Sequence, residues 1–149
     1  MAQSNPPLRL TPREAFTAIA LAIAAADGCV TPLELDMARQ FLRTLRLFQD
    51  SDEPSLENTL VKLEGLLREG GMMPLADAAC RALNPDLSRS AFVCALDIAL
   101  IDRHFDVIER AMMGELQKML GLSEAFTQAA IEVMTAKHQL RRPGATAQR

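Results

Sequence analysis

Apolar residues recur along this chain at spacings of three and four, and no segment shows the strict alternation of a half-buried β-strand. Between residues 56 and 67, for example, four leucines share one helical face, and Gly70-Gly71 should end that helix. The pattern predicts an all-α fold, a compact bundle of about seven helices. We place these helices at residues 12–26, 32–47, 55–69, 74–83, 88–102, 107–120 and 123–138.

Capping residues mark several of the predicted helix starts. Thr11-Pro12-Arg13-Glu14 and Thr31-Pro32-Leu33-Glu34 share one order of residue types. In each, Thr should cap the free N–H groups, Pro takes the first helical position, and Glu reaches back to the cap. Asp106 with Glu109, and Ser123 ahead of Glu124, indicate two further starts.

The first and fifth helices are apolar on nearly every side. Their sequences AFTAIALAIAAA (15–26) and AFVCALDIALI (91–101) predict two central helices that the others surround. Asp97 is an acid inside this second stretch, and because an unpaired buried charge is very costly, it must reach solvent, a cation or a partner such as Arg. We expect it at a solvated edge of the bundle, and we expect His138 on the surface near a helix C-terminus.

The chain contains an internal repeat. A shift of 75 residues aligns segment 19–47 with segment 94–122, and it pairs Asp27 with Asp102 and Glu34 with Glu109. The shared unit is a buried helix, an acidic turn and an amphipathic helix. Two copies predict a duplicated, compact bundle, since solenoids need three or more repeats.

Length and composition favour one domain with short tails. Residues 10–139 should form the helical domain, with flexible tails at 1–9 and 140–149, the latter basic. A formal charge of −3 and the absence of Trp and Tyr argue against nucleic-acid binding. Three cysteines fit a disulfide framework poorly and favour reduced thiols in a cytoplasmic protein.

The apolar segment near the N-terminus resembles the core of a signal peptide. Glu14 at its boundary, the prolines before it and its recurrence later in the chain argue against cleavage. Its 12 residues, 15–26, are also too few to span a bilayer. We therefore predict no membrane span.

The acidic turns are the candidate functional site. Asp27 and Asp102 each follow a buried helix, at the end where the helix dipole disfavours a carboxylate. They could accept N–H bonds from the turn, with Glu34 and Glu109 as capping partners. Alternatively, the four acids could form a site for a divalent cation such as Ca²⁺ or Mg²⁺, or a charged recognition patch.

The second turn carries additional candidate ligands. His104 and Asp106 lie between Asp102 and Glu109 and could join such a site, whereas zinc bound through His104 and Cys29 is a weaker alternative. The turn is not an EF-hand, because its Glu comes too early and the Gly that shapes an EF-hand loop is absent.

Enzyme motifs are missing from the sequence. It contains no G-x-S-x-G, no phosphate-binding Gly loop and no H-E-x-x-H. We therefore expect a protein that is not an enzyme. A hydrolase based on carboxylates is the remaining enzymatic alternative.

The two acidic units resemble the TerB-like family (tellurite resistance protein TerB), and the likeness covers roughly residues 10–138. The residues that carry it are Ala26-Asp27-Gly28-Cys29-Val30 with Glu34, and Ile101-Asp102 with Phe105 and Glu109. The resemblance implies an all-helical, duplicated fold and a role in tellurite or related chemical-stress resistance. It also implies metal binding, or contacts with protein partners of a stress-response complex, through Asp27, Glu34, Asp102 and Glu109.

One residue departs from that family pattern. Arg103 stands where the second turn usually has Gly, and its cation could replace a metal ion by pairing with the acids. The alternative function is therefore a protein-interaction or adaptor bundle with no metal site.

Overall fold

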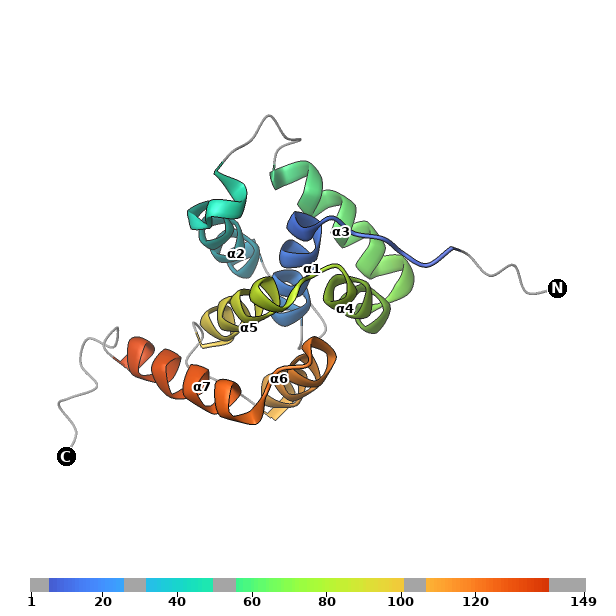
Figure 1. Cartoon of the computed structure of the whole chain (residues 1–149). Coiled ribbons are helices and arrows are strands. Elements are labelled where there is room, and N and C mark those ends of the chain that lie inside the picture. Colours follow the sequence, from blue (N-terminus) through green and yellow to red (C-terminus); the bar gives the residue numbers. More distant parts are fainter. Residues whose placement is uncertain (1–5, 26–31, 50–55, 101–106, 140–149) are drawn as a thin grey trace.

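The computed structural model describes residues 6–25, 32–49, 56–100 and 107–139, and within this part the chain is helical, with no strand (Figure 1). The predicted all-α bundle is confirmed. Its helices are α1 (Pro12–Ala24), α2 (Pro32–Thr44), α3 (Leu56–Gly70), α4 (Met72–Arg81), α5 (Pro85–Ala99), α6 (Val107–Leu120) and α7 (Glu124–Gln139), and the short 3₁₀ helix η1 (Arg46–Phe48) follows α2.

Helix α1 is the centre of the bundle. Every residue from Ala15 to Ala24 is buried, and α2, α3, α4 and α5 all pack against this helix (Figure 1). Because five of these ten residues are alanines, the backbones of neighbouring helices can approach α1 closely. The predicted central position of the first helix is confirmed.

Helix α5 is the second central element. It packs against α1 on one side and against α6 and α7 on the others. Phe92 is fully buried, and its ring centroid lies 6.4 Å from that of Phe126 on α7. The predicted central position of the fifth helix is confirmed as well.

Two of the predicted helix caps are present. The Thr11 hydroxyl accepts a hydrogen bond from the backbone N–H of Glu14 at 3.2 Å, and the Glu14 carboxylate accepts one from the Thr11 N–H at 3.2 Å. At the start of α7, the Ser123 hydroxyl accepts from the N–H of Phe126 at 3.2 Å. The predicted caps Thr31 and Asp106 lie outside the described residues.

The predicted start of the fifth helix was wrong. It begins at Pro85, three residues before the expected 88, because the Asn84 side chain accepts a hydrogen bond from the N–H of Leu87 at 2.8 Å. Asn84-Pro85 is thus a cap followed by Pro at the first helical position.

Several other boundaries differ by one to three residues, and two of these differences have a clear local cause. Helix α2 ends at Thr44 instead of 47, because Leu45 is extended (φ −77°, ψ 138°) and starts η1. Helix α4 begins at Met72, two residues early, directly after Gly71, whose φ of 82° favours glycine.

The repeat register agrees with the helix bounds around the acidic segments. A shift of 75 residues carries Ala24, the end of α1, onto Ala99, the end of α5. It also carries Pro32, the start of α2, onto Val107, the start of α6. The register does not extend further, since it places the start of α3 inside α7. That the two halves superpose in space stays a prediction.

The structure describes the segment just before α1 but not the two ends of the chain. Leu8 and Leu10, ahead of α1, are partly buried against the core. Residues 1–5 and the predicted basic tail 140–149 lie outside the described residues. In the described part, no helix has the length and apolarity needed to cross a membrane.

Candidate functional site

The predicted acidic site falls largely on parts of the chain that the structure does not describe. Asp27, Asp102, His104 and Asp106 lie outside the described residues, as does Cys29. Glu34 lies in α2 and Glu109 in α6, but their side chains are not described. Among the described residues, no group of three or more His, Cys, Asp or Glu side chains could hold a metal ion.

The helices that frame the acidic segments are described. Segment 26–31 connects α1 to α2, and segment 101–106 connects α5 to α6. Each follows the C-terminal end of a central helix, and in each the candidate Glu is the third residue of the helix that follows. The two sets of acids therefore have equivalent positions in the sequence relative to the ends of these helices.

A buried charged cluster forms where α5 meets α7. The Asp97 residue is 6% exposed, and its two carboxylate oxygens accept hydrogen bonds from the Lys137 ammonium at 2.9 and 2.8 Å. Nε2 of His138 lies 2.7 Å from one of these oxygens. Since an ionised carboxylate only accepts hydrogen bonds, this ring nitrogen carries a proton.

The cluster corrects two sequence-based expectations. Asp97 lies in the interior and not at a solvated edge, with Lys137 and His138 supplying the partners that its burial requires. His138 is not a surface residue, since its side chain is only 12% exposed. The signal in the sequence was the basic pair Lys137-His138 in the last turn of a helix, but it did not identify the partner.

The two described thiols, of which Cys94 lies near this cluster, are poor nucleophiles. Burial raises the pKa of the Cys94 thiol to about 12, and the charge of Asp97 raises it too, against a lowering by Lys137. Burial, together with the charge of Asp77, raises the pKa of Cys80 to about 11. Both thiols stay protonated at neutral pH. Neither forms a disulfide, which agrees with the prediction of reduced cysteines. The charged cluster thus links α5 to α7 through hydrogen bonds and ion pairs. The neighbouring Cys94 thiol is not an activated nucleophile.

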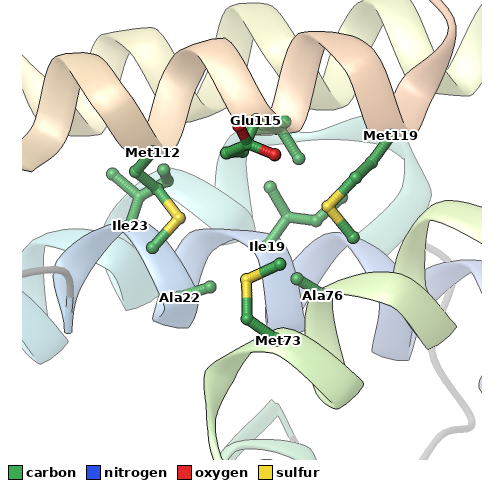
Figure 2. Close-up of a pocket in the computed structure, with 9 residues that line it drawn as sticks. Ile19, Ala22, Ile23, Met73, Ala76, Met112, Glu115 and Met119 are labelled. Carbon is green, nitrogen blue, oxygen red and sulfur yellow. The ribbon is translucent and has the colours of Figure 1, made fainter.

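A second feature is a small, open groove between α1, α4 and α6 (Figure 2). We call it the methionine groove, because Met73, Met112 and Met119 surround it. Its other lining residues are apolar except Glu115, namely Ile19, Ala22, Ile23, Ala76 and Leu116. The groove was not predicted from the sequence, although the spacing of Met112, Glu115 and Met119 places them on one helical face.

One comparison with known proteins gives a match. The family described as tellurite resistance protein TerB matches residues 13–139, from the first turn of α1 to the end of α7. No curated protein and no solved structure matches this chain. Because the matched region covers every described helix and most of the chain, the protein belongs to the TerB family.

Proposed function

We propose that this TerB-family domain acts in the cytoplasm, in resistance to tellurite or related chemical stress, as a binding module and not as an enzyme. In this proposal Asp27, Glu34, Asp102 and Glu109 hold a divalent cation or contact a protein partner of a stress-response complex. His104 and Asp106 would supplement the second half of the site.

The observation that supports the proposal is that both acidic segments lie between helices with matching ends and starts. The end of α1 and the start of α2 stand in the same register as the end of α5 and the start of α6. Because both copies carry the same acids at matching positions in the sequence, the two acidic turns could contribute equally to one shared site. Converging carboxylates repel one another, and a bound divalent cation relieves that repulsion.

A second candidate function is a protein-interaction bundle without a metal site. The observation that favours it is the capping box of α1, in which Glu14 accepts a hydrogen bond from the N–H of Thr11. Glu34 has the same place relative to Thr31 and Pro32. The Glu34 carboxylate would then accept a hydrogen bond at the start of α2, and the Asp27 carboxylate would accept N–H bonds within its own turn.

Calorimetric titration with Ca²⁺, Mg²⁺ and Zn²⁺ tests the proposal. We expect the wild-type protein to bind one of these ions and to gain about 2.7 kcal/mol of stability at a hundredfold excess over its Kd. The double change Asp27→Asn and Asp102→Asn should abolish this response, while stability without metal stays level or rises. The matched control is Asp77→Asn with Asp86→Asn, which removes two charges outside the acidic turns and should keep the response.

The outcomes separate the two candidates. If the wild-type protein shows no response to any of the three ions, the metal site is ruled out and the interaction bundle stands. Affinity capture with tagged wild-type and double-variant protein then tests the partner. Loss of captured stress-response proteins only in the double variant would assign the acids to partner binding.

A further inference from the structure

We propose that the methionine groove binds a soft monovalent cation of the Cu(I) and Ag(I) class, with the thioether sulfurs of Met73, Met112 and Met119 and the carboxylate of Glu115 as ligands. This site goes beyond the proposed function, because it uses other residues, other elements and another class of cation.

Three side chains of α6 face the groove together. Met112, Glu115 and Met119 are spaced by three and four residues, so they lie on one face of the helix over two turns. All three line the groove. The neighbouring Met113 is only 3% exposed and belongs to the core. Helix α6 thus directs Met113 into the core and Met112 and Met119 toward the groove.

A methionine on another helix faces these side chains. Met73 is on α4, across the groove from α6, and Figure 2 shows it opposite Met112 and Met119, with the side chain of Ile19 between these two. Met73 is 53% exposed, so the core does not hold it in place. Methionine has three rotatable side-chain bonds, so its sulfur can move toward an ion between the two helices.

The donor atoms at the groove suit a soft cation. Thioethers are soft, uncharged ligands that select Cu(I), whereas hard cations prefer oxygen ligands and keep their water. The floor of the groove is made of apolar side chains, including Ile19, Ala22 and Ile23, which offer a hydrated cation no hydrogen bonds. Three neutral sulfurs and one carboxylate give four ligands with a total charge that balances a monovalent ion.

Glu115 is available for this role. Its carboxylate pairs with the Lys118 ammonium at 3.5 Å, and the two side chains are 54% and 76% exposed. An exposed pair of this length contributes little to stability. A bound cation can therefore take over the carboxylate at small cost.

Titration of the full-length protein with Ag(I), followed by NMR of methionines labelled with ¹³C at the methyl group, tests the proposal. The chain has 8 methionines, so each methyl signal can be followed separately. We expect the signals of Met73, Met112 and Met119 to shift together and to saturate near one equivalent. The buried Met113 and Met134 serve as internal references.

Variants separate the thioethers from the cysteine thiols, which also bind soft ions. Replacing Met73, Met112 and Met119 by Leu keeps side-chain volume, and should weaken Ag(I) affinity at least about tenfold. The matched control, Met113→Leu with Met134→Leu, should bind as the wild type does. The Asp27→Asn and Asp102→Asn variant should also bind Ag(I) normally, so the result does not depend on the acidic turns.

Two results would overturn the proposal. One is that the three methyl signals stay in place while Ag(I) binds, which would assign the ion to the thiols. The other is a folded Leu variant with wild-type affinity. If the triple variant does not fold, Met73→Leu alone decides, because this side chain is exposed and its replacement must still lower the affinity.

Discussion

At the scale of single residues, Asp97 is the clearest case of a charge whose cost is offset by its partners. Asp97→Asn keeps the size of the side chain but turns an amide N–H₂ or a neutral oxygen toward two donors, Lys137 and His138. We expect the free energy of unfolding to fall by about 1–3 kcal/mol, measured by urea denaturation. Lys137 is 41% exposed and can still reach water, which limits the loss.

The control for this variant is a surface pair. Asp77 pairs with Arg81 one helical turn away, and both side chains are more than half exposed. Asp77→Asn should therefore change stability by less than about 0.5 kcal/mol. Equal effects of Asp97→Asn and Asp77→Asn would mean that solvent, and not Lys137 with His138, stabilises the Asp97 charge.

Glu14 should give the stability of the domain a measurable dependence on pH. Its burial raises the pKa, but the hydrogen bond and charge of Lys62 and the bonds from Thr11 outweigh this and lower the pKa below 4.5. Because the folded pKa is depressed, the stabilisation is present above pH 4.5 and is lost as the pH falls through the lower, folded value.

The variant Glu14→Gln isolates this charge, since Gln can still fill the third position of a capping box. We expect wild type to be more stable than Glu14→Gln by about 1 kcal/mol or less at neutral pH, and the two to become equal in acid. Denaturant melts at several pH values measure this. Glu132→Gln, at an exposed position of α7, is the control, and a gap at pH 7 that persists unchanged in acid would exclude the Glu14 charge as its cause.

At the scale of elements, the two Thr-Pro starts can be compared directly. Thr11 accepts the N–H of Glu14, so Thr11→Ala should cost about 1 kcal/mol. The same order of residues at Thr31 predicts the same cost for Thr31→Ala. Denaturant melts of both variants test this, and a loss at Thr11 alone would show that the second helix is capped by another residue.

The helices show what the sequence can and cannot specify. Apolar periodicity and local caps, such as Thr11 and Ser123, involve residues that are close in the sequence, so they can be predicted from it. The break at Leu45 was missed because apolar residues continue through it into η1. Contacts between helices are harder, since Asp97 and Lys137 are 40 residues apart and nothing local pairs them. The methionine groove likewise exists only once α1, α4 and α6 are packed.

At the scale of the whole molecule, burial is uneven between the first and last helices. Helix α1 has ten buried residues in succession, whereas α7 buries only Thr127, Ala130 and Met134 and packs mainly on α5. Elements with few buried contacts open locally, while central ones exchange only when the whole domain unfolds. We therefore expect slow amide exchange at Leu21 and Ile23 and faster exchange in the last turn of α7.

Hydrogen exchange of two variants tests whether α7 opens independently. Thr11→Ala lowers global stability at the far end of α1 and should speed exchange at Leu21 and Ile23 without changing α7. Asp97→Asn should speed exchange at both places, because local opening of α7 also breaks the bonds from Lys137 and His138 to Asp97. If Thr11→Ala speeds α7 as much as α1, the last helix opens only with the whole domain, and the charged cluster stabilises the bundle as one unit.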